Sequence, residues 1–106
     1  MPKYLVEASY TVEGVKGVQS AGGSSRRDAI AALAESVGGQ LESFYFAFGG
    51  EDVYVVCDLP DNAAAAALAM NVSSAGLVNI RTVVLLTPSE VDEAAKLQVS
   101  YKPPGK

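Results

Sequence analysis

The chain has 106 residues, of which 49% are hydrophobic and 19% charged, and its formal net charge is -4. This size suits a single domain with a modest hydrophobic core. Phosphate neutralisation needs a basic stripe, and the eight Lys and Arg are scattered, so we expect neither nucleic acid nor an anionic membrane as a partner. Since no signal-peptide pattern and no apolar run of membrane-span length occur, we expect a cytoplasmic protein.

The chain contains no histidine and one cysteine, Cys57. A single thiol forms no intramolecular disulfide, which fits a reducing cytoplasm. Without histidine, one chain has no Ser-His or Cys-His nucleophilic pair, no histidine-ligated haem and no conventional zinc site. We therefore expect no metal and no cofactor, and we interpret Cys57 as a small buried hydrophobe.

In chain order, residues 3–11 alternate in polarity and predict a strand. Residues 13–20 predict a short helical turn. Gly22-Gly23 then interrupts the chain, and Ser24 or Ser25 can cap a helix that runs to Val37. The glycine pair at 38–39 ends that helix.

The next segment predicts a β-hairpin. Residues 41–48 form its first strand and residues 53–59 its second, and residues 49–52, Gly-Gly-Glu-Asp, supply the connection. Two neighbouring antiparallel strands follow from this pattern.

Asp61 can cap an alanine-rich helix that begins at residue 62 or 63 and ends near Ser74. Residues 77–86 predict a fourth strand. Residues 89–98 predict a last helix, with Pro88 in its first turn. Residues 100–106 are expected to form an extended tail, so we divide the chain into one domain, 1–99, and this tail.

This order predicts an α+β, ferredoxin-like βαββαβ fold with a four-stranded antiparallel sheet and an added C-terminal helix. Two main helices can cover only one face of such a sheet. The parity that suits the covered face is almost wholly apolar and comprises Val6, Ala8, Leu41, Val53, Val55, Cys57, Val78, Ile80, Val84 and Leu86. The opposite parity combines aromatic, aliphatic and charged side chains: Leu5, Glu7, Ser9, Glu42, Phe44, Phe46, Phe48, Tyr54, Val56, Asp58, Asn79, Arg81, Val83 and Leu85.

Monomers rarely expose a large aromatic patch of this kind. Contact between the open sheet faces of two copies would cover it. We therefore predict a homodimer or a higher homo-oligomer.

Several motifs add a resemblance to a known family. They are Tyr10-Thr11 with Glu13-Gly14-Val15-Lys16-Gly17, Gly22-Gly23-Ser24-Ser25-Arg26-Arg27, Phe44-Tyr45-Phe46-Ala47-Phe48-Gly49, and Asp52-Val53-Tyr54 leading to Asp58-Leu59-Pro60-Asp61. With these motifs, residues 3–91 resemble the GYD family, small bacterial proteins related to the dimeric α/β barrels. The tripeptide that names the family reads Gly50-Glu51-Asp52 here. The resemblance implies a dimeric barrel but no activity, because the family has no assigned reaction and related folds include cofactor-independent monooxygenases, decarboxylases, isomerases and ligand binders.

Glu7, Glu42 and Arg81 share the open-face parity, which could bring two carboxylates and one guanidinium together. Two close carboxylates raise one pKa and can supply a general acid or base. The alternative is that these residues form interface ion pairs without chemistry.

Two further groups could bind a ligand. Ser24, Arg26 and Arg27 stand in the first turn of a helix, where an anion can bind, although a plain serine-capped turn has the same sequence. The side chains of Phe44, Phe46, Tyr54 and Asp58 could line a small-molecule site, or they could simply fill an interface.

The sequence thus favours an oligomeric small-molecule-binding protein with its site on the open sheet face. One alternative is a cofactor-independent enzyme of the monooxygenase or isomerase type, with Glu7 or Glu42 as base and Arg81 as an oxyanion partner. The other is a purely structural self-assembly module.

Overall fold

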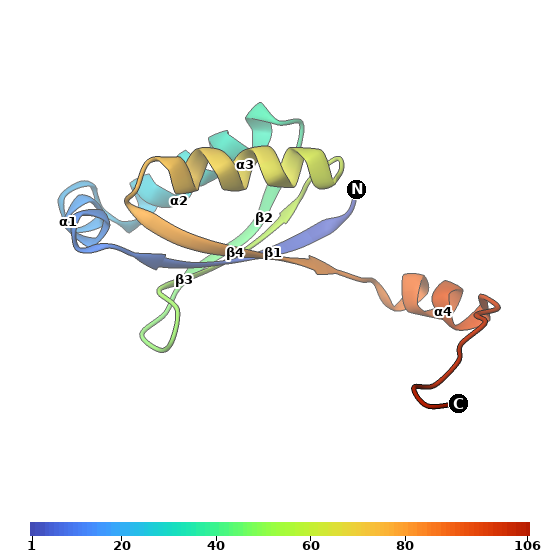
Figure 1. Cartoon of the computed structure of the whole chain (residues 1–106). Helices are drawn as coiled ribbons and strands as arrows, with labels where there is room; N and C mark the ends of the chain where they lie inside the picture. The colour runs from blue at the N-terminus through green and yellow to red at the C-terminus, as the bar shows by residue number, and fades with distance from the viewer.

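The computed structural model describes residues 1–106 as one four-stranded sheet and four helices (Figure 1). In chain order these elements are β1 (Lys3–Tyr10), α1 (Val12–Ala21), α2 (Gly23–Ser36), β2 (Gln40–Phe46), β3 (Val53–Asp58), α3 (Asn62–Ser74), β4 (Val78–Leu85) and α4 (Pro88–Lys96). The strand order is β2-β3-β1-β4 and every neighbouring pair is antiparallel. The predicted α+β, ferredoxin-like fold is therefore confirmed.

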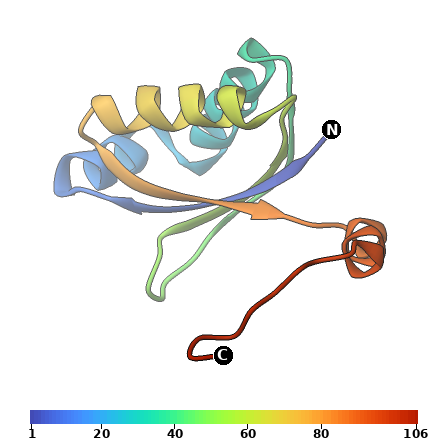
Figure 2. The ribbon, with the colours of Figure 1, turned by 45° about the vertical axis from the view of Figure 1, so that its right-hand side comes forward.

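Helices α1, α2 and α3 all lie on one side of the sheet, and its other side is open (Figures 1 and 2). The core lies between these layers. It is built from the apolar parity of β1, β3 and β4, from α2 and α3, and from Leu59 in the connection between β3 and α3: Tyr4, Val6, Ala8, Ala34, Val53, Val55, Cys57, Leu59, Ala65, Leu68 and Val78. The Tyr4 hydroxyl donates a 2.6 Å hydrogen bond to Asn62 Oδ1, which satisfies the one polar atom of the largest buried side chain.

The polypeptide beyond β4 projects away from the body of the molecule (Figures 1 and 2). Helix α4 begins with a capping box, in which Thr87 accepts from the Glu90 amide and Glu90 accepts from the Thr87 amide. Every side chain from Leu86 to Lys106 is exposed. No helix of the chain has both the length and the apolar run that crossing a bilayer requires.

The sequence predicted the N-cap of α3 correctly and that of α2 incorrectly. Asp61 caps α3 as expected, through a 2.9 Å bond from the Ala64 amide. The serine cap predicted for α2 is wrong, because that helix begins at Gly23 and Gly22 is its N-cap without any side-chain bond. Gly22 has φ 93° and ψ 157°, a backbone conformation essentially restricted to glycine, and this lets the chain turn directly from α1 into α2.

The structure also corrects the expectation that successive side chains of the second strand alternate regularly between the two faces of the sheet. Leu41 pairs with Cys57 and Ser43 with Val56, so β2 carries one extra residue, Glu42, at a β-bulge. A bulge reverses which parity faces the core. Phe44 therefore packs against the core on the helix side, and its ring meets that of Phe46 edge to face at a centroid distance of 5.2 Å.

The same bulge places Phe46 on the helix side. A Cβ built on Gly23 of α2 would lie 2.9 Å from a ring carbon of Phe46, so a side chain there would have to displace that ring. Phe48 lies beyond the end of β2, in the connection to β3, and is fully exposed. The prediction that Phe44, Phe46 and Phe48 share the open sheet face is thus wrong.

Candidate functional site

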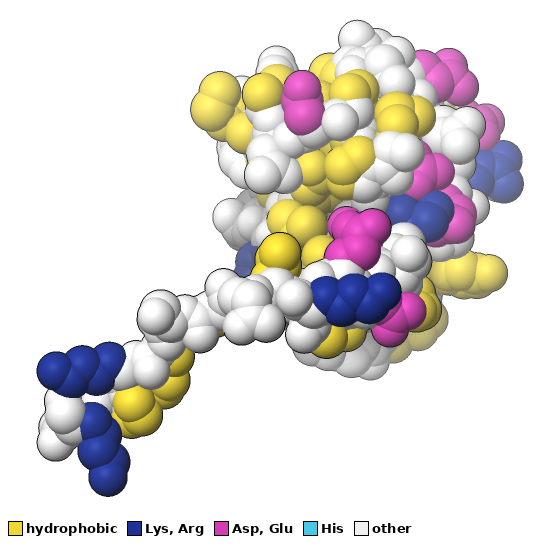
Figure 3. Space-filling model, turned by 90° about the vertical axis from the view of Figure 1, so that its right-hand side faces the viewer, with side chains coloured by type: hydrophobic (Ala, Val, Ile, Leu, Met, Phe, Trp, Pro, Cys, Tyr) yellow, Lys and Arg dark blue, Asp and Glu magenta, His cyan; other side chains and the backbone are white.

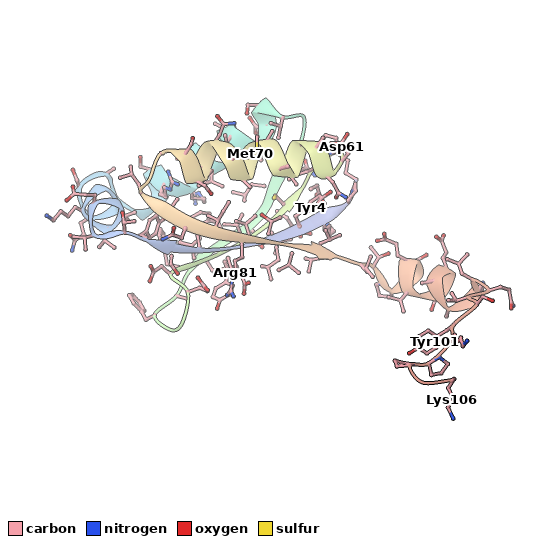
Figure 4. The ribbon with its side chains drawn as sticks, viewed as in Figure 1. Tyr4, Asp61, Met70, Arg81, Tyr101 and Lys106 are labelled. Carbon is pink, nitrogen blue, oxygen red and sulfur yellow. The ribbon has the colours of Figure 1, made fainter.

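The open face of the sheet consists of rows of side chains that cross β1, one of its two central strands. Leu5 stands between Val56 and Val83 in the middle row. Lys3 and Glu7 lie in the outer rows, on either side of Leu5. The labelled side chain of Arg81 extends from this face, opposite to Tyr4 on the helix side (Figure 4). The face therefore has a polar group at each end and an apolar strip between them.

The first polar group, here called the arginine cluster, comprises Glu7, Ser9, Glu51 and Arg81. Arg81 Nη2 lies 2.6 Å from Glu51 Oε1 and 3.6 Å from Glu7 Oε2. The Ser9 hydroxyl donates a 2.6 Å bond to the other Glu51 oxygen. The Glu7 and Glu51 side chains are only 21% and 18% exposed, although Arg81 itself is 68% exposed. One guanidinium thus faces two largely covered carboxylates, and the cluster has a surplus negative charge.

The β2–β3 connection holds Glu51 in this position. Its base is closed by a 2.8 Å bond from the Ala47 amide to the Asp52 carbonyl, and the Asp52 amide donates to the Ala8 carbonyl at 2.8 Å. The Asp52 carboxylate also accepts from the Tyr10 amide at 2.9 Å. These bonds attach the hairpin to β1, and the adjacent Glu51 side chain is thereby directed toward Arg81.

The second polar group, here called the lysine cluster, comprises Lys3, Gln40, Glu42 and Asp58. Lys3 Nζ lies 3.0 Å from Glu42 Oε1 and 2.9 Å from Asp58 Oδ1. Gln40 donates a 3.2 Å bond to the second oxygen of Asp58. Glu42 therefore belongs to this cluster, where the bulge places it, and the structure does not bring it together with Glu7 and Arg81. Within these four residues carboxylates outnumber cations by one, but the positive charge of the N-terminus also helps to lower the pKa of Asp58, so this cluster has no clear surplus of negative charge.

The remaining residues singled out from the sequence are dispersed. Tyr54 lies on the open face beside Glu7, and 37% of it is exposed. Ser24 is exposed, and Arg27 binds the neighbouring Asp28 at 2.9 Å. Arg26 differs from Arg27, because its side chain is partly buried on the helix side of the sheet.

Cys57 is buried in the core, and burial together with the nearby Asp58 charge raises the pKa of its thiol. A raised pKa leaves little thiolate and makes the residue a poor nucleophile. No group of three or more Cys, Asp or Glu side chains has an arrangement that could hold a metal ion.

The family model described as GYD domain matches residues 4–95. The chain belongs to the GYD domain family. Neither the comparison with curated proteins nor that with solved structures finds a match.

Glu51, the residue expected from the sequence at the tyrosine position of the naming tripeptide, is the nearer of the two carboxylate partners of Arg81. Sequence reasoning noted the difference but did not include Glu51 among the site residues. Arg81 lies within an otherwise apolar strand pattern, and such a cation requires an acidic partner. The need of Arg81 for acidic partners could have pointed to an acid other than Glu7.

The lysine cluster makes a testable pH prediction. Hydrogen bonds from Lys3 and then Gln40 hold the pKa of Asp58 below its ordinary 3.8, and Asp58 and then Glu42 raise the pKa of Lys3 above 10.5. The stabilisation is therefore complete between these ordinary values, and it is lost as the pH falls below 3.8 or rises above 10.5. We expect Lys3→Met to be less stable than the wild type in urea at pH 7, and this difference to vanish well below pH 3.8.

Lys16→Met is the matched control. Lys16 pairs with Glu13 at 3.6 Å, but both side chains are mostly exposed, so its removal should change stability little at any pH. A Lys3→Met deficit that is absent at neutral pH, or that persists unchanged in acid, would contradict the interpretation.

Proposed function

We propose that this GYD domain is a homo-oligomeric small-molecule-binding protein of the cytoplasm, whose ligand site lies on the open sheet face and is closed by a second copy. The observation that carries the proposal is the make-up of this face. An apolar strip of Leu5, Val56 and Val83, which no other element covers, lies between the lysine cluster and the arginine cluster, and the arginine cluster has a surplus carboxylate. The single buried thiol, Cys57, is compatible with a reducing compartment.

The apolar strip supports a second copy as the covering partner. No element of the chain packs on this side, and Val83 is 41% and Tyr54 37% exposed. Each cluster presents both a cation and carboxylates, so the face can be self-complementary around a twofold axis. Burial of the strip in such a contact would remove apolar surface from water, at about 25 cal/mol for each Å².

The surplus negative charge favours a ligand site between the two copies rather than an interface without a ligand. Two copies placed face to face would bring the surplus carboxylates of their two arginine clusters into the contact. Buried charges without partners are costly, and like charges across an interface cost several kcal/mol. A bound molecule with hydrogen-bond donors or positive charge beside an apolar part would satisfy these groups.

Native mass spectrometry of protein purified without added ligand tests this proposal. We expect a particle of at least two chains, each of 11.0 kDa, that carries additional mass and releases a small molecule on denaturation. A monomer would contradict the proposal. An oligomer without bound mass would instead support the purely structural assembly module.

A second candidate function, catalysis by a carboxylate base, rests on the geometry of the arginine cluster. Glu7 is largely covered and lies 3.6 Å from Arg81, so a base and a cation that can stabilise an oxyanion stand side by side. Glu7→Gln separates this candidate from simple binding. An enzyme would yield a different small molecule from this variant than from the wild type, because unconverted substrate would accumulate, whereas a binder would yield the same molecule from both.

A further inference from the structure

A cavity of about 450 Å³ lies on the helix side of the sheet, away from both polar clusters. Helices α1, α2 and α3 and the start of β4 surround it, where α1 and α2 lie beside the C-terminal end of α3 (Figures 1 and 2). Its walls are mainly apolar and include Val18, Ile30, Leu33, Val72 and Leu77. Cavities of this size and character hold small organic ligands.

Arg26 is the only charged residue that lines this cavity. Its Nε is buried without any hydrogen-bond partner, and it is the only buried side-chain nitrogen or oxygen of the chain in this condition. The side chain takes part in none of the ion pairs, and no aspartate or glutamate lines the cavity. A cation that lines an apolar cavity without an acidic partner is costly unless an anion neutralises it, and that missing partner, rather than the fully buried Nε, is what a ligand in the cavity would supply.

We infer that this cavity binds a small organic monocarboxylate, with the carboxylate on Arg26 and the apolar body against the helices. The planar guanidinium fork matches a carboxylate in two parallel hydrogen bonds. A single cation favours one negative charge over a phosphate dianion, and the apolar walls favour a hydrocarbon body. Tyr10, Ser25 and Asn71 are the other polar residues of the lining and stand at the same cavity. This site is separate from the open face, because the sheet lies between them.

Isothermal titration calorimetry with 2-naphthoate and its uncharged match, 2-naphthamide, tests the inference on the full chain, with octanoate as a second carboxylate of different shape. We expect at least one carboxylate to bind and 2-naphthamide to bind about 10- to 100-fold more weakly than 2-naphthoate. Inorganic phosphate, which lacks an apolar body, should not compete. Failure of both carboxylates to bind at millimolar concentration, or equal binding of acid and amide, would overturn the inference.

Variants of neighbouring arginines locate the site. Arg26→Met should weaken carboxylate binding by about 10- to 100-fold and Arg26→Lys by less, because lysine keeps the charge but loses the fork. Arg27→Met is the matched control, since Arg27 pairs with Asp28 outside the cavity, and it should bind as the wild type does. Arg26→Met should also melt no lower than the wild type without ligand, because it removes an unsatisfied buried donor. Unchanged carboxylate binding in Arg26→Met, or equal losses in both methionine variants, would assign the binding elsewhere.

Discussion

Replacement of Val83 by arginine should dissociate the proposed face-to-face assembly while each chain stays folded. Val83 lies in the apolar strip beside Leu5, and 41% of it is exposed in the single chain, so the monomer accommodates a longer side chain. In a face-to-face assembly, both copies would bring a new cation into the contact. Burial of such charges costs several kcal/mol, so we expect association at least 100-fold weaker. Sedimentation equilibrium over a range of concentrations measures this change.

Val84→Arg is the matched control. Val84 is the next residue of β4, is 54% exposed, and pairs with Tyr4 on the opposite side of the sheet. Its replacement should leave association unchanged. If both variants dissociate equally, or neither does, the open face is not the contact that holds the copies together. Successive residues of β4 point to opposite faces of the sheet, so Val83 and Val84 test the open face and the covered face separately.

Replacement of Gly14 by alanine should destabilise the fold by about 2 to 3 kcal/mol, as expected for overpacking of a tight contact. Gly14 is buried in α1, and a Cβ there would lie only 2.1 Å from the Leu77 carbonyl oxygen and 3.1 Å from the Tyr10 ring. That carbonyl accepts bonds from both the amide and the hydroxyl of Thr11, each at 3.0 Å, so it cannot move freely. Urea denaturation should show the loss, and the melting temperature should fall by about 10 °C.

Gly17→Ala, three residues further along the same helix, is the control for Gly14→Ala. A Cβ at Gly17 would meet nothing within 4 Å. The higher helix propensity of alanine should then leave stability unchanged or raise it by up to about 1 kcal/mol. A Gly14→Ala variant as stable as Gly17→Ala would show that the contact of α1 with Leu77, just before β4, is not close-packed.

The overall topology could be predicted from the sequence because local rules and global fold agree. Alternation of polar and apolar residues located all four strands, and Asp61 marked the start of α3. The first helical segment is longer than expected, since α1 runs from Val12 to Ala21 with Thr11 as its cap. A threonine directly after a strand was the available indication of that cap.

The candidate site was less predictable, because its composition depends on a one-residue insertion. Strict alternation placed Phe44, Phe46 and Glu42 on one face. The bulge instead turns both phenylalanines to the helix side, where Phe44 packs against the core and Phe46 stays exposed, and it directs Glu42 to Lys3. A bulge has no unique sequence pattern in this strand. Long-range pairing across the sheet, as between Glu51 and Arg81, likewise depends on register and hairpin geometry that local sequence does not specify.

The charged residues near the start of α2 illustrate the same difficulty. Arg26 and Arg27 are equivalent in sequence, yet one side chain enters a cavity and the other pairs with Asp28 in solvent. Both arginines lie near the start of α2, which has Gly22 as its N-cap, so their side chains point in different directions around the helix. One residue of helix corresponds to a turn of about 100°, which decides which arginine faces the sheet.

A crystal structure of the protein purified without added ligand tests the central claim most directly, because it shows what covers the open face. In the single chain, acidic and basic side chains lie among hydrophobic ones on the body of the molecule (Figure 3). We predict that the sheet of a second copy lies over Leu5, Val56 and Val83. We also predict that Glu7, Glu51 and Arg81 line an enclosed space that holds a small molecule. An open face exposed to solvent, or covered by a close-packed seam without such a space, would contradict the account.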